Sequence, residues 1–271
     1  MAAGRGELIP GTDTPWFRRA FVRWMRGFVG RRFHAVRLAA GSEAAFARAA
    51  SADGPVMLVA NHQSWWDPLV GLLVHDRWFG DRPVASPIDR TQLENFRFFR
   101  RLGMFGVDPD DATGLRAFAR HVDGLFAGAP RTVLMLTPQG RFVDARRPVE
   151  ARPGAAMVAA RHPGLAVISV AIEYAFWVDQ RPEVFLRAAT VAAPAAGGDS
   201  AHAWQPAIEG AMNANAAALA ECVASRDPSR FSLVSGGGAG RIHPAYDAFL
   251  RLTGRRTSID VSHRAPREGR A

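Results

Sequence analysis

Hydrophobic residues follow two alternating patterns along the chain. Short apolar runs bounded by Gly, Pro or polar residues predict strands at 56–60, 104–107, 132–137, 166–174 and 183–191. Between them, apolar residues recur at helical spacing and predict helices at 68–79, 90–101, 111–127, 152–161 and 202–224. This order predicts an α/β fold with a mostly parallel central sheet flanked by helices, in which functional residues gather at the carboxyl ends of the strands.

The segment before the first of these strands has a different pattern. Residues 15–32 place four aromatic residues on one helical stripe and three arginines opposite: Phe17, Phe21, Trp24 and Phe28 against Arg19, Arg23 and Arg26. A basic amphipathic helix of this kind is typical of a segment that lies in a membrane interface. The alternative is a helix whose aromatic stripe packs on the protein's own body. No stretch of about 18 uncharged apolar residues predicts a spanning helix.

Basic residues concentrate at the two ends of the chain. All 34 are arginine, and 25 acids leave a formal net charge of +9. The formal net charge is +6 for residues 1–40 and +4 for residues 251–271, whereas it is −1 for residues 41–250. We therefore predict a basic N-terminal segment (1–40), the α/β domain (41–250) and a basic tail (251–271). Because the predicted domain is nearly neutral, the charge favours an anionic membrane surface as partner and not nucleic acid.

Two residue types are scarce, which excludes some chemistry. A chain without lysine has no Walker-type phosphate loop and no Schiff-base lysine. The single cysteine, Cys222, cannot form an internal disulfide, so we expect a reducing compartment. No Cys cluster or His pair has metal-ligand spacing, and we expect no metal site.

The chemically informative segment is Asn61-His62-Gln63-Ser64-Trp65-Trp66-Asp67, which follows the strand at 56–60. Across a loop that leads into a helix, the Asp67 carboxylate can fold back onto the His62 ring. An aspartate bound to one ring nitrogen fixes the tautomer and stabilises the imidazolium, so the other nitrogen can take a proton from a hydroxyl. The spacing therefore indicates a general-base dyad. An Asp67 that only caps the following helix is the alternative.

This segment resembles the first motif of the glycerolipid acyltransferase family, Asn-His-x-Ser-x-x-Asp, typified by 1-acyl-sn-glycerol-3-phosphate acyltransferase. Asn61, His62, Ser64 and Asp67 all match it. Residues 102–109 resemble the second block, although Pro109 stands where the family has Arg. Residues 137–142 resemble the third block: Pro138 and Gly140 match, Gln139 replaces an acid, and Arg141 lies one place early. Residues 152–156 and 167–171 are similar to later family segments.

The resemblance implies acyl transfer from a thioester co-substrate, acyl-CoA or acyl carrier protein, to the hydroxyl of a lipid acceptor, with no other cofactor. His62 would be the base and Asp67 its partner, with Asn61 and Ser64 supporting the motif. Gln139, Gly140 and Arg141 would bind the acceptor, a lysophospholipid such as 1-acyl-glycerol-3-phosphate, and loop amides near Gly140 would face the oxyanion. The expected location is peripheral, on the cytoplasmic face of the cell membrane.

Two alternatives remain open from the sequence. The altered second and third blocks also fit a non-phosphate acceptor, such as a glycosylated carotenoid. They fit a non-catalytic lipid-binding homologue as well, although such a protein has no need to keep both His62 and Asp67.

Overall fold

The structure is a computed structural model that describes residues 8–108, 112–177, 179–195, 200–237, 249 and 252–254. Within them, eight strands form one sheet in the order β4-β3-β5-β2-β6-β7-β1-β8. Their bounds are β1 Ala35–Ala39, β2 Val56–Ala60, β3 Val84–Asp89, β4 Met104–Val107, β5 Val133–Leu136, β6 Ala166–Ala175, β7 Glu183–Thr190 and β8 Phe231–Gly236. The helices are α1 Pro15–Arg32, α2 Ser42–Ala50, α3 Asp67–Trp78, α4 Arg90–Asn95, α5 Ala112–Gly128, α6 Gly154–Arg161 and α7 Ala201–Ser225, with 3-10 helices η1 Arg97–Arg101 and η2 Pro228–Arg230.

The sheet is mostly parallel, as the sequence predicted. Strands β4, β3, β5, β2 and β6 run in the same direction, whereas β7 is antiparallel to β6 and β8 is antiparallel to β1. In register, Val59 of β2 lies beside Leu136 of β5, and Ala60 lies beside Val170 of β6. The carboxyl ends of these three central strands therefore meet at one edge of the sheet.

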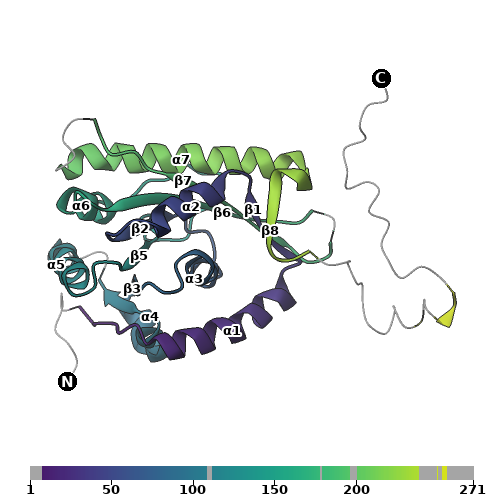
Figure 1. Cartoon of the computed structure of the whole chain (residues 1–271), viewed down its shortest axis with the longest axis horizontal. Coiled ribbons are helices and arrows are strands. Elements are labelled where there is room, and N and C mark those ends of the chain that lie inside the picture. The colour runs from purple at the N-terminus through teal and green to yellow at the C-terminus, as the bar shows by residue number, and fades with distance from the viewer. Residues whose placement is uncertain are drawn as a thin grey trace.

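Helices cover both faces of the sheet (Figure 1). Along β2, Val56 and Leu58 pack with buried residues of α1, α2 and α3, whereas Met57 and Val59 pack with those of α5, α6 and α7. This alternation follows from the two-residue period of a strand. Because both faces are covered, β2 is a nearly continuous apolar run rather than an alternating one.

Three strands and one α-helix were not predicted from the sequence, namely β1, β3, β8 and α2. The strand β1 lies within the predicted 1–40 segment, yet it occupies a place in the sheet between β7 and β8. Residues 90–101 do not form the single helix that we predicted, because Phe96 leaves the helical conformation (φ −120°, ψ 62°) and separates α4 from η1. Most of the predicted tail, residues 251–271, lies outside the described residues.

Helix α1 packs on the body through a face beside the aromatic stripe. Its buried residues are Arg18, Val22, Met25 and Val29, and the stripe residues Phe17, Phe21 and Phe28 are half-buried against the same core. Trp24, by contrast, is 57% exposed. The stripe is therefore divided between the core and the surface. None of the helices described here has the length and apolar character needed to cross a bilayer.

Candidate active site

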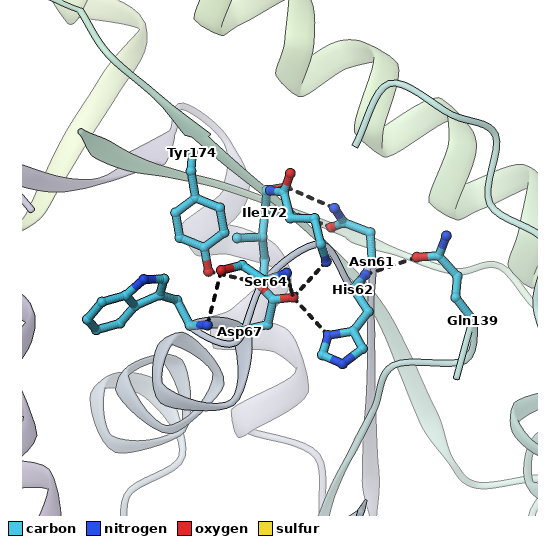
Figure 2. Close-up of polar contacts among 9 residues, drawn as sticks. Asn61, His62, Ser64, Asp67, Gln139, Ile172 and Tyr174 are labelled. Atoms are coloured by element: carbon cyan, nitrogen blue, oxygen red, sulfur yellow. Dashed lines mark hydrogen bonds and ion pairs between the residues drawn. The ribbon is translucent and has the colours of Figure 1, made fainter. Parts of the chain in front are cut away.

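The loop between β2 and α3 is fastened to the neighbouring strand β6 by side chains. The Asn61 amide donates to the Ile172 carbonyl (2.9 Å), and its oxygen accepts from the Ile172 amide (2.8 Å). The Gln63 side chain donates to the same carbonyl (2.8 Å). Figure 2 shows these contacts, in which Asn61 continues the pairing of β2 with β6 beyond the end of β2. The buried amide of Asn61 thereby fixes the residues that follow it.

His62 and Asp67 are in contact, as their spacing predicted. His62 Nδ1 and Asp67 Oδ2 are 2.8 Å apart, and the same oxygen accepts from the amides of Gln63 (2.8 Å) and Ser64 (2.9 Å). The Asp67 side chain is 2% exposed and the His62 side chain 18%. Asp67 is the first residue of α3, and its carboxylate binds the loop before the helix rather than amides of the first turn. The geometry is thus that of an imidazole held by a buried carboxylate.

Two residues complete the surroundings of the dyad. Ser64 turns its hydroxyl back to accept from the Trp66 amide (3.2 Å), which tightens the turn into α3. Tyr174, near the end of β6, donates its hydroxyl to Asp67 Oδ1 (2.7 Å). Burial, together with the Asp67 charge, raises the pKa of Tyr174 far above its usual value, so the phenol remains a donor. The sequence patterns did not single out Tyr174; its only signal was its position at the carboxyl end of a predicted strand.

The loop after β5 holds the backbone of His62. The Gln139 side chain accepts from the His62 amide (2.9 Å), and the Val143 amide donates to the His62 carbonyl (2.7 Å). Gln139 is buried and does not line the cavity described below, although we had assigned it to the acceptor. Its contact is with the loop between β2 and α3.

Gly140 and Arg141 do line that cavity. Gly140 has a left-handed conformation (φ +63°), and a Cβ at this position would lie 2.7 Å from Arg152 Nε. Its amide donates to the Thr137 carbonyl (3.0 Å), so this amide is engaged within the turn instead of being free for an oxyanion. Arg141 is 70% exposed and 3.6 Å from Glu150, which leaves its guanidinium accessible to an anion.

A cavity of about 920 Å³ opens at the dyad. Much of its lining is apolar and comes from β2, α3, β4, β5 and η1, with Leu58, Val70, Val74, Phe99, Met104 and Met135 among the lining residues. Near His62 the lining includes the exposed Phe142, and the centroids of the Phe142 and His62 rings are 4.4 Å apart. The charged groups of the lining, apart from the dyad, are Asp89, Asp108, Arg141 and Arg152. A mainly apolar cavity with a few polar groups in its lining suits an amphipathic ligand.

Pro109, in the second block, is outside the described residues. In the part of the chain that the structure describes, no three His, Cys, Asp or Glu side chains gather as a metal site.

Comparison with known proteins matches part of the chain to a family. A search of curated proteins found no match to the chain. The model of the Acyltransferase family, which includes the glycerolipid acyltransferases, matches residues 42–173. This range runs from α2 to β6 and contains the dyad, the Gln139-Gly140-Arg141 loop and much of the cavity wall. Residues 42–173 are therefore an acyltransferase-family domain.

Proposed function

We propose that this protein transfers an acyl group from a thioester, acyl-CoA or acyl carrier protein, to a hydroxyl of a lipid acceptor, most simply a lysophospholipid such as 1-acyl-glycerol-3-phosphate. The observation that carries this proposal is the 2.8 Å contact between His62 Nδ1 and Asp67, both of which line a largely apolar cavity. The family match supports acyl transfer in general. The cavity supports a lipid as one of the substrates.

The dyad can perform the chemistry without a protein nucleophile. His62 Nε2 takes the proton of the acceptor hydroxyl while the hydroxyl oxygen attacks the thioester carbonyl. The tetrahedral intermediate then expels the thiolate, which takes the proton from the imidazolium, so an ester and a free thiol are formed. Asp67 stabilises the imidazolium between these two steps.

Arg141 is our candidate for the acceptor's phosphate. It lies on the cavity wall beside Gly140, with its guanidinium mostly in solvent, and planar guanidinium groups bind phosphate oxygens in pairs. Arg141→Ala should raise the KM for a phosphate-bearing acceptor about tenfold and leave the KM for the thioester unchanged. An unchanged acceptor KM would assign phosphate binding to another residue.

We further propose that the protein docks peripherally on the cytoplasmic face of an anionic membrane, with α1 at the surface. Ring contacts continue from α1 to the cavity: Trp24 with Phe28 (5.3 Å), Phe28 with Trp66 (5.3 Å) and Trp66 with the exposed Trp65 (5.6 Å). Trp65 lines the cavity. Aromatic rings beside the exposed arginines of α1 are suited to a headgroup boundary.

Point substitutions test this docking, because removing α1 would also remove core residues. Trp24→Ala combined with Trp65→Ala should lower flotation with phosphatidylglycerol-containing liposomes by about tenfold. The matched control is Leu233→Ala, which removes an exposed side chain on the edge strand β8. Equal flotation of both variants would refute docking through this surface.

The test of the catalytic proposal is thiol release from a panel of acyl thioesters, combined with mass spectrometry of the lipid product. Lysophosphatidate, other lysophospholipids and a glycosylated lipid serve as acceptors. Acceptor-dependent release by the wild type, lost in a folded His62→Ala variant, is the expected result. Transfer only to the glycosylated lipid would keep the mechanism and change the acceptor class. Lipid binding without transfer from any donor would reject the enzymatic proposal.

A further inference from the structure

Tyr174 contacts the dyad from a strand that the first motif does not include. Its hydroxyl donates to Asp67 Oδ1 at 2.7 Å, whereas the bonds from His62 and from the two loop amides all end on Oδ2. Among the described residues, Tyr174 is the donor found at Oδ1. Each oxygen of the buried carboxylate is therefore satisfied, and one of them depends on Tyr174 (Figure 2).

The ring of Tyr174 is itself held in place. It packs against the buried Phe33, just beyond the end of α1, with 5.6 Å between ring centroids. Phe33 also contacts Trp66 in an edge-to-face arrangement at 4.9 Å, one residue before Asp67. On the strand, Tyr174 pairs with Val184 of β7. Backbone pairing and ring packing together fix the direction in which the hydroxyl points.

We propose that Tyr174 is a positioning residue that fixes the plane of the Asp67 carboxylate and stabilises its negative charge through a hydrogen bond, so that Asp67 can orient and stabilise the His62 ring. This inference rests on the proposed acyl transfer by the dyad. A hydrogen bond to a carboxylate favours its charged form and restricts its rotation. Without the phenol, Oδ1 would be a buried anionic oxygen with no protein donor, and the dyad would hold a proton more readily.

The variant Tyr174→Phe removes the hydroxyl and keeps the ring against Phe33. We expect kcat to fall about tenfold, because a hydrogen bond to a charged group is lost, while the KM values of both substrates stay within about twofold. The acid limb of the pH-rate profile should also move to higher pH. The other charged groups of the cavity are the same in both proteins: Asp89 from β3, Asp108 after β4, Arg141 after β5 and Arg152 before α6.

Ser169→Ala is the matched control on the same strand. It removes a buried hydroxyl that accepts from Asn215 (3.1 Å), which weakens β6 without touching the dyad. We expect its kcat and its pH profile to equal those of the wild type. If Tyr174→Phe also behaves as the wild type, or if Ser169→Ala loses as much kcat, Tyr174 has no positioning role.

A second measurement separates this inference from the proposed function. The rate at which diethyl pyrocarbonate modifies His62, followed by mass spectrometry of its peptide, reports on the free imidazole without any acyl transfer. The pH dependence of this rate should move to higher pH in Tyr174→Phe and not in Ser169→Ala. An inactive wild type would refute the proposed acyl transfer, whereas the modification profile would still decide the role of Tyr174. Superimposable modification profiles of the wild type and Tyr174→Phe would reject the positioning role of Tyr174.

Discussion

Replacing Asp67 with asparagine removes the charge of the dyad while preserving its shape. The Asp67 carboxylate accepts from four donors, namely His62 Nδ1, the amides of Gln63 and Ser64, and the Tyr174 hydroxyl. An amide at position 67 can keep its oxygen toward the first three. Its NH₂ group then faces Tyr174, whose hydroxyl can turn to accept. Each of the four contacts thus keeps a donor and an acceptor in Asp67→Asn, with the Tyr174 contact reversed, and the negative charge is missing.

The size of the effect follows from the position of the charge. Unit charges about 4 Å apart attract by about 4 kcal/mol at an effective dielectric constant of about 20, which suits partly buried pairs. Asp67 is buried and His62 is partly in solvent, so this value applies to the imidazolium that forms in the proposed mechanism. At about 1.4 kcal/mol for each factor of ten, we expect kcat of Asp67→Asn to fall about 10³-fold.

The assay is thiol release under saturating substrates, with thermal unfolding as the control for folding. Asp67→Asn should unfold within a few degrees of the wild type, because its hydrogen bonds are conserved. In the double variant His62→Ala/Asp67→Asn, the loss of kcat should equal the loss in His62→Ala alone, because the proposed role of Asp67 is exerted through the imidazole. A folded Asp67→Asn enzyme within fivefold of the wild-type kcat, or fully additive losses, would refute this account of the dyad.

Three further predictions follow from individual side chains. Gly140→Ala should raise the acceptor KM and lower the melting temperature. An alanine in the left-handed conformation is strained by about 1 kcal/mol, and its Cβ would displace Arg152. An unchanged acceptor KM and melting temperature would contradict this prediction. Burial, followed by the charge of Arg18, lowers the pKa of His75 from 6.5 to about 3. At low pH the unfolded chain therefore binds a proton at His75 that the folded chain does not bind. The free energy of unfolding should fall by roughly 2 kcal/mol between pH 7 and pH 5, as urea unfolding can measure. The fall should be smaller in His75→Gln. Asp13→Asn should cost about 3 kcal/mol in the same assay, because it leaves the buried Arg18 guanidinium without its carboxylate at 2.9 Å; a loss below about 1 kcal/mol would show that the pair is not a stabilising anchor.

The contact between His62 and Asp67 could be predicted because it is local. Both residues lie in one loop between a buried strand and a helix, so spacing and turn chemistry were sufficient. The strand β2 could be predicted as well, since a strand in a sheet that is covered on both faces is a nearly continuous apolar run. The strand β3 was not, because Ser86, Pro87 and Asp89 interrupt its pattern, and its pairing with β5 covers only Val84 and Ala85.

The contacts that hold the dyad in place could not be predicted, because they join residues far apart in sequence. Tyr174 is 107 positions from Asp67, and Gln139 is 77 positions from His62. Position in a motif suggested that Gln139 would face the acceptor, but Gln139 is buried and accepts a hydrogen bond from the backbone amide of His62. A motif identifies which residues are near a site, whereas the direction of each side chain depends on the packing of neighbouring strands.

The fold also restricts how a membrane could reach the dyad. Helix α1 is anchored by Arg18, which is buried and bonded to Asp13 and to the carbonyls of Gly80 and Arg82. If α1 left the body, the Arg18 guanidinium would lose these partners. Detaching α1 would therefore cost a large amount of free energy. Immediately after α1, Phe33 packs against Tyr174 and Trp66. In the docking that we propose, the membrane therefore meets α1 in its folded position, and a lipid acceptor enters beside Trp65 without any rearrangement of the residues that hold Asp67.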